Sequence, residues 1–303
     1  MLPPGCFTHT LSLLVSAMLP PGSSQHVSRR LLRLALLVAV DTFPDHTLMK
    51  IFTSITDWHF AKGFVESLVR QSKAVVSATI DVYRAVTESF LPTPSKCHYL
   101  FNLRDLSRVI KGVLLVPATH MKDLNKLVAL WLHETYRCFC DRLVNDEDRE
   151  KLFAIAYKAV YANFRVHLDA VLTDLGYLEA GETPAHAHAA SIVFGNYMQP
   201  DADPKIYDLV QDIDDMAVKM EYYLGEYNAA SCSPMRLVMF RCALDHVSRC
   251  ARVLLQDNGA CALTSCTTWD VPATERKPED PRDFLSNLGR LLAFWRERGW
   301  LNR

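Results

Sequence analysis

The chain has 303 residues, of which half are apolar and 22% are charged. These proportions exclude a wholly disordered chain and a fibrous one, and the length allows one large domain or two of medium size. The formal net charge of −1 gives no reason to expect a nucleic-acid partner. Nine cysteines lie scattered without a CxxC pair, so we expect reduced thiols and no metal site built on them.

Two apolar runs lie within the first 40 residues. The run Leu11 to Leu19 resembles the apolar part of a signal peptide, but no basic residue precedes it. The run Leu31 to Val40 contains Arg33 and is too short to span a bilayer. Both runs have the length and composition of buried strands, and we expect no membrane contact.

From Thr47 the apolar spacing becomes helical. The first predicted helix has Asp45 or Thr47 as its cap and an apolar face formed by Leu48, Ile51, Phe52, Ile55 and Trp58. Further helices are predicted over 72–90, over 103–113 with Asn102 as cap, over 123–140, and from Asn145 to about residue 168. The core of this bundle is expected to contain Trp58, Leu106, Ile110 and Trp131.

The second half of the chain is less regular. Residues 178–204 contain several glycines and prolines, and a solvated linker is favoured there over a metal site at His186 and His188, because no third ligand is near. Helices are then predicted from Asp203-Pro204 to Leu224 and from Ser233-Pro234 to about residue 254. A polar stretch with three prolines, residues 269–283, precedes a last amphipathic helix over 284–300.

Catalytic motifs are absent from the sequence: it holds no GxxxxGK[ST], GxGxxG, HExxH or GxSxG. His133-Glu134 begins like HExxH, but Arg137 takes the last position, so helix-face residues are the favoured interpretation. Asp212, Asp214 and Asp215 are expected on the solvated side of a helix. Arg29, Arg30 and Arg33 interrupt an apolar stretch, either to meet an anion or as surface residues.

Several segments resemble one family. LPTPSKCHYLFNLRDLSRVIKG (91–112) and CFCDRLVNDEDR (138–149) closely resemble the lid of the third AAA+ module of dynein heavy chains, particularly the axonemal ones. SAMLPPGSSQHVSRRLLRLA (16–35) is similar to the segment that precedes this lid. IVFGNYMQP (192–200) and MRLVMFRCALDHVSRCARVLLQDNGACAL (235–263) resemble the entry into the fourth module.

The sequence also departs from the family at two places. Ser23-Ser24-Gln25 stands where the family has a Gly-Gly-Arg turn, and no nucleotide loop follows Leu263. The resemblance therefore implies a slice of a motor that runs from within one ATPase module into the next. We divide it into a remnant of the third large subdomain (1–43), a helical lid (44–178), a linker with the opening helices of the fourth module (179–265) and an unrelated tail (266–303).

The implied fold is mainly α, a helical AAA+ lid bundle flanked by incomplete pieces of two α/β modules. The resemblance implies that Arg104 is the lid arginine that senses nucleotide, and that Arg30 and Arg33 lie in the region that reaches the neighbouring module's nucleotide. An ion pair of Arg104 with Asp105 or Glu134 is the competing interpretation, and it would carry no function.

The implied parent function is ATP-driven force generation on microtubules, with this chain as a structural relay between modules. ATP and magnesium belong to the parent motor, and we expect no cofactor in this chain and no ATP hydrolysis by the chain alone. Expected partners are the other AAA+ modules, dynein intermediate and light chains and, indirectly, microtubules, in the cytoplasm, cytoskeleton and ciliary axoneme. The alternative is a non-catalytic helical interaction or scaffold protein derived from a decayed motor gene.

Overall fold

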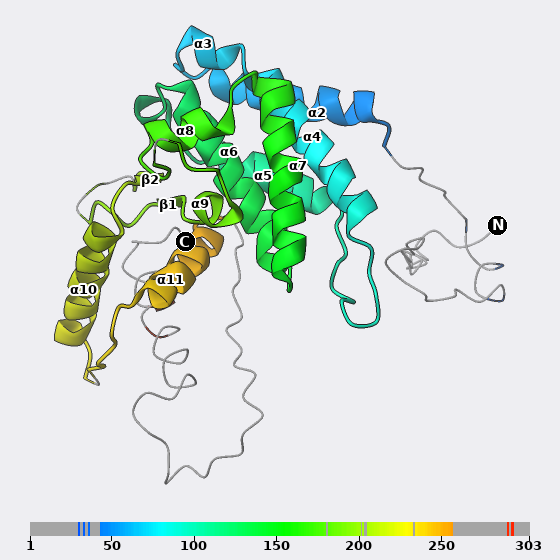
Figure 1. The fold of residues 1–303 in the computed structure, drawn as a ribbon. Helices are drawn as coiled ribbons and strands as arrows, with labels where there is room; N and C mark the ends of the chain where they lie inside the picture. Colours follow the sequence, from blue (N-terminus) through cyan, green and yellow to red (C-terminus); the bar gives the residue numbers. More distant parts are fainter. Residues whose placement is uncertain are drawn as a thin grey trace, which may run out of the picture.

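A computed structural model of the chain describes residues 30, 33, 36, 43–179, 181–200, 202, 205–232, 234–256, 290, 292 and 293. This part of the chain is mainly helical, which confirms the predicted fold class (Figure 1). Its α-helices are α2 (Asp45–Phe60), α3 (Glu66–Val69), α4 (Ser72–Ser89), α5 (Leu103–Val113), α6 (Leu124–Phe139), α7 (Asp146–Phe164), α8 (Leu168–Asp174), α9 (His186–Ala190), α10 (Ile213–Ala230) and α11 (Arg241–Leu255). Short 3-10 turns cover Ala118–His120 and Cys140–Arg142.

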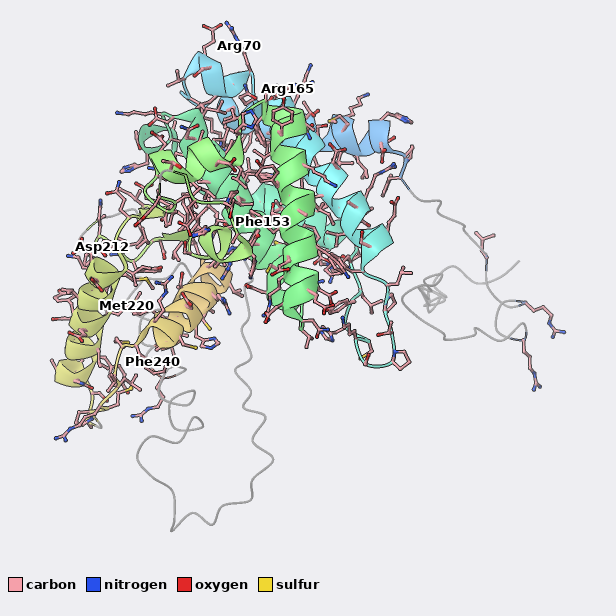
Figure 2. The ribbon with its side chains drawn as sticks, viewed as in Figure 1. Arg70, Phe153, Arg165, Asp212, Met220 and Phe240 are labelled. Carbon is pink, nitrogen blue, oxygen red and sulfur yellow. The ribbon has the colours of Figure 1, made fainter. Side chains whose placement is uncertain are left out.

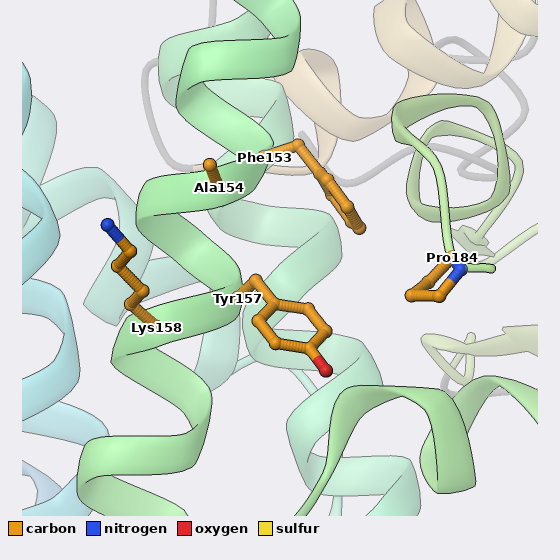
Figure 3. Close-up of a pocket in the computed structure, with 5 residues that line it drawn as sticks. All are labelled: Phe153, Ala154, Tyr157, Lys158 and Pro184. Atoms are coloured by element: carbon orange, nitrogen blue, oxygen red, sulfur yellow. The ribbon is translucent and has the colours of Figure 1, made fainter.

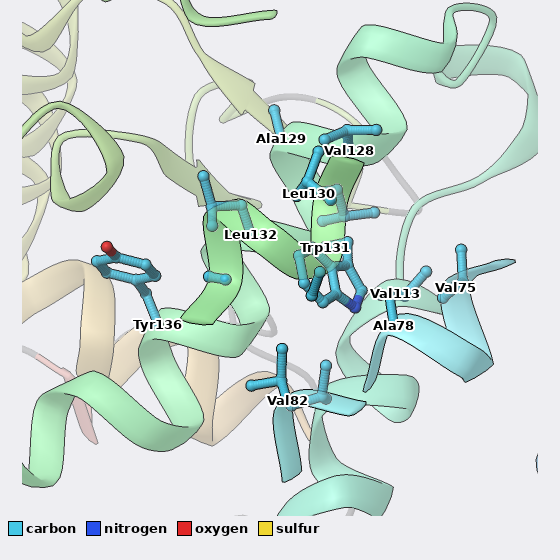
Figure 4. Close-up of a cluster of buried hydrophobic side chains, with 14 of the residues drawn as sticks. Val75, Ala78, Val82, Val113, Val128, Ala129, Leu130, Trp131, Leu132 and Tyr136 are labelled. Carbon is cyan, nitrogen blue, oxygen red and sulfur yellow. The ribbon is translucent and has the colours of Figure 1, made fainter. Parts of the chain in front are cut away.

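The helices from α2 to α9 form a bundle around one core. Helix α4 packs against α2 and α7, and α6 packs against α5 and α8. Trp131 of α6 is fully buried in this core, as predicted, and its indole N–H donates to Thr79 Oγ1 at 2.9 Å (Figure 4). Leu106 and Ile110 are buried as well. Satisfying the indole N–H inside the core removes the cost that an unpaired buried donor would carry.

The prediction that Trp58 lies in the core is wrong. Its side chain is 62% exposed, and the Lys62 ammonium lies 3.3 Å from the centre of its ring. Helix α2 buries Leu48, Thr56 and Phe60 instead. The apolar side chains of α2 cover a broad arc from Trp58 and Ile51 round to Phe60, so the spacing alone could not decide which part of that arc meets α4.

A smaller unit follows the bundle. Strand β1 (Val193–Gly195) pairs antiparallel with β2 (Asp208–Val210), and α10 and α11 pack beside them over a second apolar cluster. The prediction of a helix from Asp203-Pro204 is wrong over 208–210, which form strand β2. Pairing with β1 outweighs the helical spacing of Ile206, Leu209 and Val210. Helix α10 starts at Ile213, with Asp212 as the cap that accepts from the Asp214 N–H at 2.9 Å (Figure 2).

Helix α11 also starts later than predicted, at Arg241 instead of Ser233-Pro234. The Asn228 side chain holds the intervening segment: it donates to the Met235 carbonyl and accepts from the Met235 N–H, both at 2.9 Å. These bonds satisfy the backbone of Met235 in a non-helical conformation. Most of the two predicted buried strands before residue 43 lies outside the described residues, although Leu36 in the second of them is 93% exposed. Most of the predicted helix over 284–300 also lies outside them.

Candidate functional site

Arg104 lies in the first turn of α5 with its side chain exposed. As predicted, Asn102 caps this helix: its side chain accepts from the Arg104 N–H at 3.0 Å, and the Asp105 carboxylate accepts from the Asn102 N–H at 3.1 Å. This reciprocal pair is a capping box, and it fixes the start of α5. The guanidinium of Arg104 therefore leaves the bundle from a well-defined helix end.

The carboxylates that could have paired with Arg104 are bound elsewhere. Asp105 is 1% exposed and pairs with Arg108 and with Arg142. Glu134 pairs with Arg252. Within the described ranges, no ion pair joins Arg104 to either acid, so the geometry does not support the competing salt-bridge interpretation.

Arg30 and Arg33 are both exposed. No ion pair or hydrogen bond in the described part of the chain joins either of them to Arg104. Most of the residues around them in sequence lie outside the described part. The three arginines named from the resemblance are therefore not assembled into one site here.

A buried charged cluster instead joins the bundle to α11. The Glu134 carboxylate of α6 is fully buried, and its Oε2 accepts from both Nε and Nη2 of Arg252, with 2.9 Å to Nε. Its other oxygen, Oε1, accepts from the Tyr207 hydroxyl at 2.8 Å. Arg252 also lies 3.8 Å from the Cys138 sulfur through Nη2. We call Glu134, Cys138, Tyr207 and Arg252 the junction cluster.

Helix α5 closes the junction cluster from the other side through Gly112. A Cβ on Gly112 would lie 1.8 Å from Glu134 Oε2 and 2.2 Å from its Cδ. Only glycine leaves room for the carboxylate at this crossing. The position of Glu134 is therefore set by α5, α6, α11 and the segment that carries Tyr207.

The electrostatics of the junction cluster favour the ionised pair. Burial disfavours the charge of Arg252, but the Coulombic attraction and hydrogen bonds of Glu134 outweigh it, and the pKa of Arg252 is raised. Burial and the adjacent Glu134 carboxylate raise the pKa of Tyr207 well above 10, so its hydroxyl remains a donor. Burial raises the pKa of Cys138 to about 11, which keeps this thiol protonated and unreactive at neutral pH.

His133, His186 and His188, which the sequence singled out, each contact other side chains or backbone groups of the fold. His133 is buried beside the junction cluster and donates from Nδ1 to the Ile192 carbonyl at 2.8 Å. Burial, together with Arg137 and Arg252, lowers its pKa well below 6.5. His186 stacks on Tyr136 with 5.6 Å between ring centres, and His188 Nδ1 accepts from the Ala185 N–H. In the part of the chain that the structure describes, no three potential metal ligands gather.

Sequence reasoning missed the junction cluster because it treats Glu134 as a helix-face residue. A signal was present: Glu134 follows the apolar run Leu127 to Leu132, and Arg252 lies between Cys250-Ala251 and Val253-Leu254-Leu255. A charged residue inside an apolar stretch is rarely buried unless it is paired. Nothing local, however, relates two residues that are 118 positions apart.

Comparison with known proteins identifies the bundle. The AAA+ lid domain family matches residues 75–173, which include α5, α6, α7 and Glu134. Dynein axonemal heavy chain 3 of Mus musculus and of Homo sapiens are each 46% identical over 248 residues, and dynein axonemal heavy chain 12 of Mus musculus is 36% identical over 255 residues. This chain is homologous to axonemal dynein heavy chains.

The matched segment is 82% of this dynein-homologous chain but only 6% to 8% of the length of these relatives. The family match confirms an AAA+ lid over residues 75–173, and the homology does not favour the scaffold alternative. Glu134 lies inside the matched lid and Arg252 lies beyond it. The junction cluster therefore ties the lid to the segment that follows it. None of the helices in the described ranges has the length and apolar character needed to cross a membrane.

Proposed function

We propose that this chain is the lid and the lid-to-next-module junction of a dynein-type motor. In this role it relays movement between consecutive AAA+ modules, namely the third and the fourth. The observation that carries the proposal is the buried Glu134–Arg252 pair, because it joins α6 of the lid directly to α11. Rigid-body movement of the lid would then displace α11 with it.

The nucleotide chemistry belongs to the parent motor in this proposal. A phosphate site needs backbone donors, a lysine and a hydroxyl that holds magnesium, and the sequence has no such loop. Arg104 would supply a cation to the phosphates of the third module's nucleotide from the capped end of α5. Arg30 and Arg33 would face the neighbouring module's nucleotide. Arginine suits both roles because it stays charged and grips phosphate through two N–H groups.

The partners in the proposal follow from the homology. The chain would work inside a ring of AAA+ modules within a dynein, together with intermediate and light chains, and would act on microtubules only through that motor. Its location would be the cytoskeleton and the ciliary axoneme. The names of the relatives support this location, since each is an axonemal heavy chain.

The test uses a full-length axonemal dynein heavy chain in which this segment replaces the homologous one. Glu134→Gln removes the negative charge of the pair and keeps the shape of the side chain. Glu66→Gln is the matched control, because Glu66 forms an exposed pair with Arg70. We expect Glu134→Gln to reduce microtubule gliding velocity severalfold while the motor stays folded, and Glu66→Gln to leave it unchanged. Equal velocities for the two variants would refute the relay role of the junction.

Arg104 is tested in the same motor. Arg104→Ala should weaken nucleotide-linked lid closure and slow gliding, and Arg104→Lys should restore the rate only in part, because an ammonium keeps the charge but lacks the planar fork of N–H donors that matches phosphate. Unchanged nucleotide affinity and gliding in Arg104→Ala would show that Arg104 is an ordinary surface arginine.

A further inference from the structure

The exposed side chain of Arg104 depends for its direction on the helix start that carries it. Arg104 lines neither of the two shallow hollows on α7, which have volumes of about 320 and 300 Å³. Figure 3 shows the smaller of them, with Phe153, Tyr157 and Pro184 around it. A long side chain on an open surface places its guanidinium only as accurately as the backbone below it is held.

Arg142 binds the start of α5 from outside that helix. It belongs to the 3-10 turn Cys140–Arg142, directly after α6. Its Nη1 donates to the Leu100 carbonyl at 3.1 Å and to Asp105 Oδ2 at 3.0 Å, and its Nη2 donates to Asp105 Oδ1. The guanidinium also lies 5.7 Å from the centre of the Phe101 ring. One side chain therefore contacts the segment before α5 and the first turn of α5 together.

The Asp105 carboxylate is where the contact with Arg142 meets the capping box. Its Oδ2 accepts from the Asn102 N–H at 3.1 Å as well as from Arg142, and its Oδ1 accepts from Arg108 at 3.2 Å. The Asp105 side chain is 1% exposed, whereas that of Arg108 is 48% exposed. A carboxylate this deeply buried depends on its closest counter-charge, and the two-pronged contact with Arg142 supplies it.

The turn that carries Arg142 is itself held in place. His98 donates from Nε2 to the Arg142 carbonyl at 3.0 Å. The neighbouring Asp141 carboxylate lies 3.6 Å from Arg137 Nη1 and 3.7 Å from Arg249 Nε of α11. A side chain can position another group only if its own base is fixed. The same turn therefore contacts the start of α5 on one side and α11 on the other.

We propose that Arg142 is the positioning residue for Arg104. By clamping the start of α5 to the turn after α6, it keeps the Arg104 guanidinium in the direction that a nucleotide phosphate requires. Arg142 acts only through Arg104 and does not touch the nucleotide. This role rests on the proposed function of Arg104 and deepens it, because it names the residue that controls that site.

Hydrogen exchange of the purified full-length chain tests the clamp without any nucleotide. Arg142→Met removes the N–H donors and keeps an unbranched side chain. The amides of residues 102, 104 and 105 should then exchange about tenfold faster, because the capping box loses a charge-assisted support. The matched control is Lys126→Met near the start of α6: Lys126 pairs with Asp208 at 2.6 Å, and its side chain is 21% exposed against 29% for Arg142.

Lys126→Met should leave the exchange of these amides unchanged. Unchanged exchange in Arg142→Met would overturn the proposal, because the capping box would then form without the clamp. Arg142→Lys serves if Arg142→Met does not fold. It keeps the charge but lacks the planar fork of donors, so exchange should rise by a smaller factor, and no rise at all would overturn the proposal.

Nucleotide affinity tests whether Arg142 acts through Arg104. The protein is the full-length motor that carries this segment, with the phosphate-loop lysine of every other module replaced by alanine, and the probe is a fluorescent ATP analogue. Arg104→Ala should lower the affinity about tenfold through loss of a charge-assisted contact. Arg142→Met should lower it about threefold to fivefold, because the start of α5 is then correctly placed for only part of the time. Lys126→Met should have no effect.

The double variant separates positioning from general support of the fold. In the Arg104→Ala background, Arg142→Met should cause no further loss of affinity, and a further loss would overturn the proposal. A loss in Arg104→Ala with none in Arg142→Met would also overturn it, and would leave the proposed function of Arg104 intact. Unchanged affinity in Arg104→Ala would refute that proposed function, and the positioning role with it, whatever the exchange rates show.

Discussion

Removing one partner of the Glu134–Arg252 pair should destabilise the chain more than removing both. Arg252→Met leaves a fully buried carboxylate with Tyr207 as its remaining donor, and Glu134→Gln leaves a guanidinium that is 9% exposed without a counter-ion. Loss of one partner of a buried pair costs about 3 to 5 kcal/mol, so additive effects would total about 6 to 10 kcal/mol. In the double variant the introduced amide oxygen still accepts from Tyr207, and only the amide N–H₂ lacks a partner, at a cost of about 1 to 3 kcal/mol.

Urea unfolding of the purified chain, followed by far-ultraviolet circular dichroism, measures these differences. The matched control is the exposed pair Glu66–Arg70, where Glu66→Gln should cost less than about 0.5 kcal/mol. Losses below about 1 kcal/mol in both single variants would show that the pair is hydrated and not buried. Strict additivity in the double variant would show that the two charges do not interact.

Three further predictions follow from the burial of single groups and from the missing phosphate loop. In the same urea assay, Trp131→Ala should lower the free energy of unfolding by about 3 to 5 kcal/mol, because its side chain is fully buried. Trp58→Ala on the surface should lower it by less than about 1 kcal/mol. Equal losses in the two variants would contradict the assignment of the core. The pKa of His133 is lower in the folded chain than its unfolded value of about 6.5, so below that pH the unfolded chain binds a proton that the folded chain does not. The free energy of unfolding should therefore fall as the pH drops below about 6.5. Melts between about pH 5 and 7.5 should show a flatter pH dependence for His133→Asn. The purified chain should turn over ATP below about 0.01 per second, and a faster magnesium-dependent rate would reveal a nucleotide site that the sequence does not show.

Local sequence signals predict the lid well. The sequence indicates Asn102 as a helix cap, and the capping box with Asp105 confirms it. The helix predicted over 123–140 agrees with α6 to within one residue at each end, because an unbroken apolar stripe and a following turn leave few alternatives. Trp131, in the middle of that stripe, is buried as expected.

The failures lie where distant segments decide the structure. Residues 208–210 have helical spacing, but β1 offers backbone partners that only the fold brings close. Trp58 lies at one edge of the broad apolar arc of α2, so the position of α4 decides which part of that arc is buried. Glu134 and Arg252 each look anomalous in their apolar surroundings, yet only the folded chain shows that they pair.

The long separation of Glu134 from Arg252 has a consequence for synthesis of the chain on the ribosome. At about 5 to 20 residues per second, the 118 positions that separate them take about 6 to 24 seconds to translate. During that interval the nascent lid carries Glu134 without its counter-ion, at the crossing where Gly112 of α5 lies against α6. We therefore expect tight closure of α5 on α6 to follow the emergence of α11, so that a helix beyond the lid in sequence completes the packing of the lid itself.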